Sequence, residues 1–408
     1  MKSSHRWISW GLLVFGFIVV FFHRLSIGSV ADQLMLDLNL DSVQIANLAS
    51  MNFYGYAAMQ LPVGIMVDTI GVRKICTIGM FVAAIGSIIF GIAGHKYVAY
   101  SARFLVGIGT SVIIVSIMKI QSTLFPQNMY STLSGLTSFF GNFGAFFATL
   151  PLSFIAVNFG WRNTFVILGM MTLALAVGIF FFVKDKKVSE DHEKIKIKEA
   201  VRFVIFNKKV YPDFFVMVFY VGSLTAVLGL WGNGYMKAVY QISNESAAFY
   251  MSFITYGFII GAPIVGKLSD LLGGEIKKIL LVASSSYVLL WLYVLIVQHG
   301  KPPLGQWSLL YFLMGIMTIC HILVFSNVKE NNPLKYTGTA ISLVNIGEFI
   351  GSGIISLSMG YMIKRFMLTD MILEDVYKSA MILVLIAAVL SFVAVLMMQR
   401  HIKKTEKR

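Results

Sequence analysis

Five ionisable side chains interrupt long apolar stretches of this sequence, and they are the residues best suited to chemistry. They are Arg24, Arg103, Lys119, His321 and Glu348. If those stretches cross a membrane, a charged group within them is costly to bury and is a functional candidate by default. A guanidinium offers a planar fork of donors that matches a carboxylate or a phosphate. A carboxyl or an imidazole can instead take up and release a proton.

The composition indicates that these stretches do cross a membrane. Hydrophobic residues make up 57% of the chain and charged residues only 13%, with a mean hydropathy of +0.79. A soluble protein carries roughly 25% charged residues. The deficit runs along the whole chain, which predicts many spans rather than one anchor. The cysteines Cys76 and Cys320 lie in apolar runs, and we expect small buried side chains rather than a disulfide or a metal pair.

Twelve stretches are long enough to span a bilayer, which needs about 20 apolar residues. They divide into two groups of six, so we predict an all-α integral membrane protein with twelve transmembrane helices. An N-terminal six-helix bundle is expected over residues 1–183 and a C-terminal one over residues 211–400. The basic segment 184–210 is expected to be a linker that forms, in part, an amphipathic helix on the membrane. Residues 401–408 are expected to be a short tail.

The placement of Lys and Arg predicts the orientation of the chain. If the N-terminus is cytoplasmic, most basic residues fall in cytoplasmic segments, as the positive-inside rule requires. Both termini and the linker are therefore predicted to be cytoplasmic, in a multi-pass protein of the inner (plasma) membrane. This distribution explains the net charge of +14, and we expect no nucleic-acid partner.

One turn between apolar runs occurs in both halves. It reads Gly-Ile-Met-Val-Asp-Thr-Ile-Gly-Val-Arg-Lys over residues 64–74, and a weaker copy begins at residue 266. A second match relates Asn142 and Gly144 to Asn345 and Gly347 at nearly the same offset. Two matches in step predict two pseudo-symmetric bundles. The turns are predicted to act in gating, through Gly64, Asp68, Gly71, Arg73, Lys74, Gly266 and Asp270.

The six-plus-six arrangement, the basic central segment and the 64–74 turn resemble the major facilitator superfamily. The run Arg103-Phe-Leu-Val-Gly-Ile-Gly109 resembles a second, weaker signature of that family. The resemblance covers about residues 7–400. It implies a secondary transporter with alternating access, rather than an enzyme, and a substrate site near the midplane between the halves.

The sequence departs from the family pattern at two places. Thr69 stands where the family usually has Arg, and residues 135–148 lack the Gly-Pro of the antiporter signature. The second departure argues against a drug/proton antiporter. Other runs, such as Phe22-His-Arg-Leu-Ser26 and Lys329-Glu-Asn-Asn-Pro333, are similar to a bacterial branch of phagosomal nutrient transporters. That branch takes up amino acids or nucleosides.

These observations predict proton-coupled import of a small polar nutrient, such as an amino acid, a nucleoside or an organic anion. The proton gradient is the expected driving force, with no cofactor or metal, and the protein is expected to be a monomer in the lipid bilayer. Arg24 is the predicted contact for an anionic group, unless it only pairs with an acid such as Asp32. Glu348 is predicted to carry the proton, because it lies near the middle of its span, where an unpaired carboxylate would favour the protonated form. Its counterpart in the other half is Ala145, so the repeat itself does not require an acid there. A permanent ion pair is the alternative role of Glu348.

His321 and Arg103 are further proton-coupling candidates, and His321 could equally be a satisfied core histidine. Polar and aromatic residues expected to complete the substrate cavity are His23, Asn52, Tyr56, Gln60, Asn142, Tyr220, Trp231, Tyr256 and Asn345. An uncoupled facilitator or an exporter is the alternative function. A polytopic membrane enzyme or a transporter-like sensor is a remote one, because the sequence has neither a clustered catalytic motif nor a soluble signalling domain.

Overall fold

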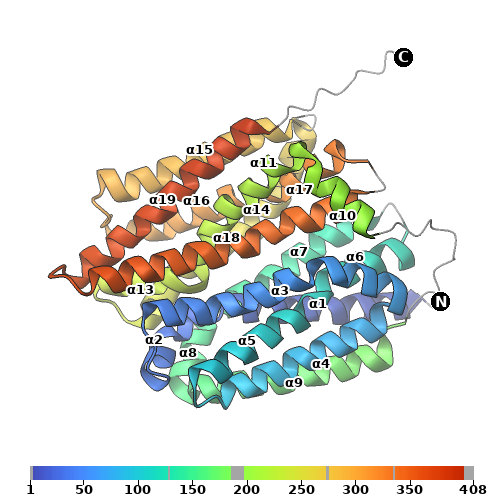
Figure 1. Ribbon diagram of the computed structural model, residues 1–408, viewed down its shortest axis with the longest axis horizontal. Coiled ribbons are helices and arrows are strands. Elements are labelled where there is room, and N and C mark those ends of the chain that lie inside the picture. The colour runs from blue at the N-terminus through green and yellow to red at the C-terminus, as the bar shows by residue number, and fades with distance from the viewer. Residues whose placement is uncertain (1–2, 127–128, 185–196, 273–274, 334–335, 399–408) are drawn as a thin grey trace.

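The computed structural model describes residues 3–126, 129–184, 197–272, 275–333 and 336–398, which fold into two bundles of helices (Figure 1). The N-terminal half contains α1 (Ser3–Leu25), α2 (Ile27–Asp37), α3 (Ser42–Ile70), α4 (Val72–Gly91), α5 (Lys96–Thr110), α6 (Val112–Leu124), α7 (Tyr130–Phe147), α8 (Leu150–Phe159) and α9 (Trp161–Phe182). The C-terminal half contains α11 (Tyr211–Val216), α12 (Gly222–Ala226), α13 (Gly232–Tyr240), α14 (Asn244–Leu271), α15 (Ile276–Leu292), α16 (Trp307–Ile319), α17 (Ile322–Asn331), α18 (Thr337–Phe366) and α19 (Leu373–Met397).

Within the described residues, eleven helical segments are long and apolar enough to cross a membrane. Several of them join consecutive helices, such as α5 with α6 and α16 with α17. The span from Lys208 to Tyr240 joins α11, α12 and α13 through two π-helical turns, Met217–Val221 and Val227–Trp231. These segments agree with the membrane protein that the composition predicts.

The twelfth span of the predicted set is α3, which has 29 residues. It is long enough to cross a bilayer, but amide side chains at Gln44, Asn47, Asn52 and Gln60 interrupt its apolar character. Asn52 and Gln60 are nevertheless buried. The helix that fits the membrane least well by composition therefore contains buried polar groups, and these are candidates for a functional site.

The two halves repeat the same glycine-mediated helix contact. A Cβ atom at Gly55 of α3 would lie 2.3 Å from the carbonyl oxygen of Phe104 in α5. In the other half, a Cβ atom at Gly257 of α14 would lie 2.3 Å from the carbonyl oxygen of Phe312 in α16. Small residues allow helix backbones to approach this closely in membranes. The equivalent contacts show the pseudo-symmetry that the duplicated turn predicts.

The halves are held together at one end of the molecule, which we call the far end. The opposite end, which we call the linker end, contains the start of α1, the end of α19 and α10 (Ile197–Phe206) (Figure 1). Between the halves, Asn244 Nδ2 donates to the carbonyl oxygen of Ser29 at 2.8 Å and to Ser153 Oγ at 2.7 Å. Ser42 Oγ donates to the carbonyl oxygen of Gly360 at 2.9 Å.

Two ion pairs, which we call the far-end ion pairs, also join the halves. Asp32 of α2 pairs with Lys237 of α13, and Asp41 pairs with Lys364 of α18 at 2.8 Å. Asp41 also caps α3 by accepting from the backbone N–H of Gln44. Burial alone would raise the pKa of Asp41, but the hydrogen bonds from Lys364 and from that backbone outweigh burial and hold it below 3.8, its usual value.

Four glycines near the linker end border open space. A Cβ atom built at any of four glycines near the linker-end termini of α3, α7, α14 and α18 would meet no neighbouring heavy atom within 4 Å: Gly64, Gly135, Gly266 and Gly338. At the far end, by contrast, a Cβ atom at Gly360 would lie 2.6 Å from the carbonyl oxygen of Ser42. Far-end glycines such as Gly94 and Gly160 also border open space, so the closure of the far end is shown by the hydrogen bonds and ion pairs that join the halves there.

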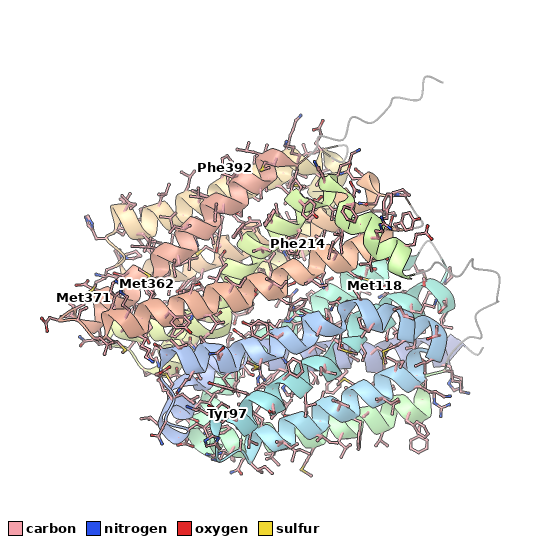
Figure 2. All side chains as sticks on the ribbon, viewed as in Figure 1. Tyr97, Met118, Phe214, Met362, Met371 and Phe392 are labelled. Atoms are coloured by element: carbon pink, nitrogen blue, oxygen red, sulfur yellow. The ribbon has the colours of Figure 1, made fainter. Side chains whose placement is uncertain are left out.

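Helix α10 lies on the C-terminal half at the linker end. The Phe203 ring stacks on Tyr336 at 4.4 Å between centroids, and Tyr336 Oη donates to Glu199 at 2.7 Å. Val204 is buried, whereas Phe206 is 74% exposed. Exposed apolar side chains also cover the outer surfaces of both bundles (Figure 2), as expected for side chains that contact lipid. Residues 185–196 of the predicted linker lie outside the described residues.

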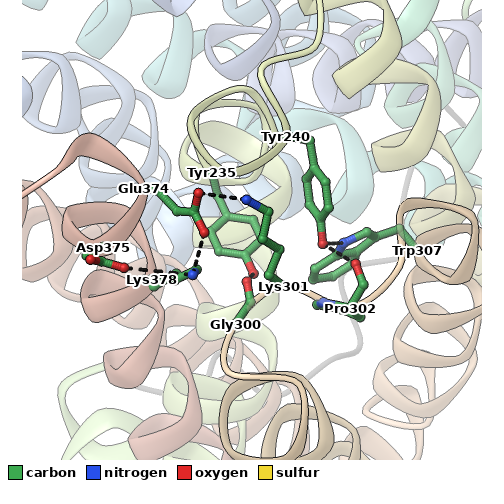
Figure 3. Close-up of polar contacts among 9 residues, drawn as sticks. All are labelled: Tyr235, Tyr240, Gly300, Lys301, Pro302, Trp307, Glu374, Asp375 and Lys378. Atoms are coloured by element: carbon green, nitrogen blue, oxygen red, sulfur yellow. Dashed lines mark hydrogen bonds and ion pairs between the residues drawn. The ribbon is translucent and has the colours of Figure 1, made fainter.

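A network of polar contacts joins three parts of the C-terminal half at the far end (Figure 3). Lys301, in the loop between α15 and α16, donates to Glu374 of α19 at 2.7 Å. Tyr235 Oη and Tyr240 Oη of α13 donate to carbonyl oxygens of the same loop, at Gly300 and Pro302. We call this set the far-end network, and it holds α13, the loop and α19 together as one unit.

Candidate functional site

The centre of the interface between the halves contains one buried ion pair. Arg24 Nη1, in the last turn of α1, lies 3.0 Å from Glu348 Oε1 in α18. The side chains are 8% and 12% exposed. Both residues were predicted from the sequence as separate candidates, and the structure brings them into direct contact. Asp32, the alternative partner of Arg24, is instead paired with Lys237 at the far end.

Three aromatic rings surround the guanidinium of Arg24. Its central carbon lies 4.9 Å from the ring centroid of Phe21, 5.2 Å from that of Tyr56 and 4.8 Å from that of Phe349. Tyr56 and Phe349 come from opposite halves and stack at 4.4 Å. Rings at these distances attract a cation and exclude water from it. The site can therefore hold an arginine charge whether or not Glu348 remains its partner.

Two buried amides lie on α3, one helical turn before and one after Tyr56. Asn52 is 2% exposed and Gln60 is 3% exposed. Within the described residues, Asn52 Nδ2 and Gln60 Nε2 have no hydrogen-bond partner. A buried donor left unpaired costs about 1–3 kcal/mol, so these amides are suited to bind oxygen atoms of a ligand. The sequence predicted both residues as substrate contacts.

His23 does not lie beside Arg24, although the two residues are neighbours in the sequence. Successive residues on an α-helix point about 100° apart, and His23 points into the N-terminal bundle, where its ring lies 6.4 Å from the Phe165 ring. Arg103 Nη2 donates to the His23 carbonyl oxygen at 2.6 Å. Arg103 is fully buried and lies 5.6 Å from the Phe90 ring. These two candidates form a separate cluster.

His321 connects α16 to α17 and lies near the central ion pair. Its Nδ1 atom is 2.8 Å from the carbonyl oxygen of Thr318, and the ring interacts electrostatically with both Glu348 and Arg24. This position is compatible with a proton relay, so the relay stays a prediction for this residue.

The remaining cavity candidates are used mainly in packing. Asn142 donates to the carbonyl oxygen of Ser138, Tyr220 to that of Met317 and Trp231 to that of Ser356. These side-chain donors are thus already bonded within their own half. Tyr256 differs, because its ring lies 5.6 Å from Phe146 across the interface. Asn345 is partly buried on α18.

Sequence reasoning missed one buried acid, Asp213, in the first turn of α11. It is 1% exposed, and Asn327 Nδ2 donates to its two carboxylate oxygens at 2.9 and 3.1 Å. Asn327 belongs to α17. The residue was passed over because it follows the basic pair Lys208-Lys209 at the edge of a span. The available signal was an acid at the start of an apolar stretch.

The structure describes part of the two gating turns. Gly71 lies between α3 and α4 with a φ of 98°, a conformation that only glycine adopts readily. Arg73 lies 4.7 Å from the Phe180 ring, and Lys74 is exposed. Gly64 and Gly266 border open space, as described above. The side chains of Asp68 and Asp270 lie outside the described part of the chain, as does Gly273.

Comparison with known proteins identifies the family. A family model described as Major Facilitator Superfamily matches residues 13–356. The chain belongs to the major facilitator superfamily. This major facilitator chain is 21% identical to a probable sulfoacetate transporter of Cupriavidus necator, over 90% of this chain and 88% of that protein. It is 23% identical to a gentisate transporter of Corynebacterium glutamicum, over 81% and 76% of the two chains.

Solved structures show the same fold. A bacterial homolog of the human lysosomal transporter Spinster, in an inward-facing and unoccupied conformation, matches with a TM-score of 0.77 and 17% identity, over 97% of this chain and 98% of that chain. A D-xylose-proton symporter matches with a TM-score of 0.76 and 13% identity, over 98% and 99%. The twelve-helix fold predicted from the sequence is thereby confirmed, and this major facilitator chain is a membrane transporter for a small molecule.

Proposed function

We propose that this transporter imports a small organic anion together with a proton. The observation that carries the proposal is the Arg24–Glu348 ion pair, buried between the halves and surrounded by aromatic rings. A guanidinium in such a site recognises a carboxylate or a sulfonate by paired hydrogen bonds and charge. Sulfoacetate and gentisate, in the names of two relatives, are organic anions, which supports this substrate class.

Competition for Arg24 supplies the coupling between substrate and proton. In the described conformation Glu348 occupies the guanidinium. A substrate anion that binds Arg24 must displace Glu348, and the displaced carboxylate would then be a buried negative charge without a cation. Such a charge is most readily neutralised by a proton. Substrate binding and protonation of Glu348 therefore favour one another, and His321, on which Glu348 acts electrostatically, is the candidate to pass the proton.

The amides of α3 give the site its polar selectivity. Asn52 and Gln60 present unpaired N–H groups to the interior. An anion that also carries hydroxyl or carbonyl oxygens would satisfy these donors, whereas a purely aliphatic acid would not. We expect sulfonate, hydroxyl or second carboxyl groups on the transported anion for this reason.

Alternating access follows from the difference between the two ends. The far end is closed by contacts between the halves, while glycines at the linker end border open space. The excess of Lys and Arg at the linker end favours a cytoplasmic location for that end. On this assignment the described conformation is closed to the outside, and breaking the far-end contacts would expose Arg24 and Glu348 to external substrate.

A binding screen tests the substrate class. Thermal shift of the purified protein is measured with sulfoacetate, gentisate and D-glucarate, and with D-xylose as a neutral comparison. We expect stabilisation by at least one of the anions and none by D-xylose. R24Q is expected to lose the stabilisation, whereas R162Q, which removes a half-exposed arginine at the far end, is expected to keep it. Stabilisation by D-xylose, or an unchanged response of R24Q, would refute the assignment of Arg24.

Uptake into proteoliposomes tests the coupling separately. With a bound anion from the screen, inward accumulation is expected when the outside is acidic. E348Q mimics the protonated carboxyl, so it is expected to retain exchange of substrate between the two sides but to lose accumulation driven by the pH gradient. If E348Q still accumulates substrate, Glu348 does not carry the proton. Exchange in the wild-type protein that ignores pH would indicate a facilitator.

A further inference from the structure

The C-terminal half contains a buried acid that the proposed transport cycle does not use. Asp213 lies in the first turn of α11, close to the linker end, where α17 packs against α11 (Figure 1). It is 1% exposed. In the described part of the chain, its carboxyl group has one hydrogen-bond partner, Asn327 Nδ2, at 2.9 and 3.1 Å from the two oxygens. A neutral amide is therefore the group that meets this acid.

No cation pairs with Asp213 among the residues that the structure describes. On α18, which also packs against α11, Glu348 is held by Arg24, and the other charged residues of α18 and those of α19 lie near the far end. Near the linker end, the charged residues of the turn before α11 and of α17 are exposed, and they are Lys208, Lys209, Lys329 and Glu330. The carboxyl group is thus enclosed by uncharged protein.

This environment suits a neutral carboxyl group better than an ionised one. A buried carboxylate without a cation is so costly that the group takes up a proton instead. An asparagine side chain offers both N–H donors and an acceptor oxygen, so Asn327 can satisfy the carbonyl oxygen or the O–H of a neutral acid. Glu348 differs, because the Arg24 guanidinium lies 3.0 Å from it and compensates its charge. The two acids therefore differ in what neutralises them.

We propose that Asp213 is a second proton-binding site of this transporter, separate from Glu348 and occupied in the described conformation. The proton can leave only when water or a cation reaches the carboxylate, because the protein around it supplies no charge. Access of that kind requires α11 and α17 to separate near the linker end. The bound proton thus stabilises the packing of these two helices, and its release accompanies their separation.

Infrared spectroscopy of the purified full-length transporter tests the protonation state, because a neutral carboxyl group and a carboxylate absorb at different frequencies. Without substrate at neutral pH, the wild type is expected to show the C=O band of a neutral carboxyl group, and D213N is expected to lose it. E348Q is the matched control, since it removes an acid that is paired with Arg24, and it is expected to keep the band. If D213N does not fold, N327A is measured instead and is expected to shift the band, because it removes the hydrogen bond.

Hydrogen–deuterium exchange of α11 and α17 tests the link between this proton and helix packing. One bound proton changes the equilibrium by about tenfold per pH unit. After correction for the intrinsic rate of amide exchange, we therefore expect exchange in both helices of the wild type to rise with pH by up to about tenfold per unit. D213N carries no titrating group at this position and is expected to lose this dependence.

Three results would overturn the proposal. One is a wild-type spectrum without a neutral-carboxyl band at neutral pH. Another is a band that D213N retains or that N327A leaves unshifted, or one that E348Q abolishes. The third is the same pH dependence of exchange in α11 and α17 for the wild type and D213N. These measurements use no substrate, so their outcomes are separate from the assignment of Arg24 as the substrate contact.

Discussion

Replacing Gly360 by alanine is expected to shift the transporter toward a conformation that opens at the far end. The added Cβ atom would lie 2.6 Å from the carbonyl oxygen of Ser42 in the opposite half. An ordinary contact is longer, and a backbone oxygen cannot move aside as a flexible side chain can. Overpacking of this kind costs about 1–3 kcal/mol, which corresponds to a change of about 5–150-fold in the ratio of the two conformations.

The matched control is the same substitution at Gly338. It lies on the same helix, α18, but near the linker end, where a Cβ atom would meet no neighbouring atom within 4 Å. G338A therefore adds no clash, and it is expected to stabilise the helix by up to about 1 kcal/mol, because alanine has a higher helix propensity than glycine. A general effect of alanine on α18 would appear in both variants, whereas an effect of the interface would appear only in G360A.

Electron–electron distance measurements between two spin labels report the opening. Tyr97 of the N-terminal half and Met371 of the C-terminal half mark the far end (Figure 2), where they are 64% and 37% exposed. We expect G360A to increase the fraction of long distances and G338A to leave the distribution of the wild type unchanged. If both variants give the distribution of the wild type, the close contact at Gly360 does not set the conformation and the reasoning is wrong.

Three further predictions follow from the polar contacts. D32N removes one far-end ion pair and is expected to favour far-end opening by about 0.2–1 kcal/mol, less at high salt, as seen with the same spin labels. Hydrogen bonds hold the pKa of Asp41 below 3.8, so the stability that Asp41 contributes is complete well above that pH and is lost as the pH falls toward the lowered pKa. D41N is expected to flatten the acid end of a melting-temperature profile measured from about pH 2 to 6. N327A removes the donor to both oxygens of buried Asp213 and is expected to lower the free energy of unfolding by about 1–3 kcal/mol, measured by thermal melting.

Two of these predictions, those for D32N and N327A, have a control within the chain. D375N removes an ion pair at the same end, but both partners, Asp375 and Lys378, belong to the C-terminal half, so the spin-label distances are expected to stay unchanged. N158A removes an exposed asparagine and is expected to change stability by less than about 0.5 kcal/mol. Equal effects of a variant and its control would contradict the role given to the contact.

The sequence predicted the fold well because its signals are local or periodic. Apolar stretches of fixed length identify spans, and the duplicated turn at residues 64–74 divides the chain into halves. The same local view identified Arg24 and Glu348 as separate candidates. It could not pair them, since they lie 324 residues apart and meet only because α1 and α18 face each other across the interface.

The errors at the site have equally physical causes. His23 was placed in the substrate cavity with Arg24 because the two residues are adjacent, but a helix directs neighbouring side chains to different surfaces. Asp213 was missed because composition alone does not tell an acid at a membrane surface from one that the fold buries. The far-end ion pairs join residues of opposite halves, such as Asp32 and Lys237, and no pattern in one sequence specifies such a pairing.

The far-end network has a consequence for how the transporter opens. Lys237 lies in α13, between Tyr235 and Tyr240, both of which bond to the loop that Lys301 ties to α19. Lys364 lies near the end of α18, which continues into α19 after a short turn. Lys237 and Lys364 thus both belong to the C-terminal half, so the two far-end ion pairs are coupled through the same pair of bundles. After one ion pair breaks, the other pair still holds the two halves close enough for the first pair to re-form. Opening therefore requires both pairs to separate, so its dependence on salt is expected to be steeper than that of either pair alone.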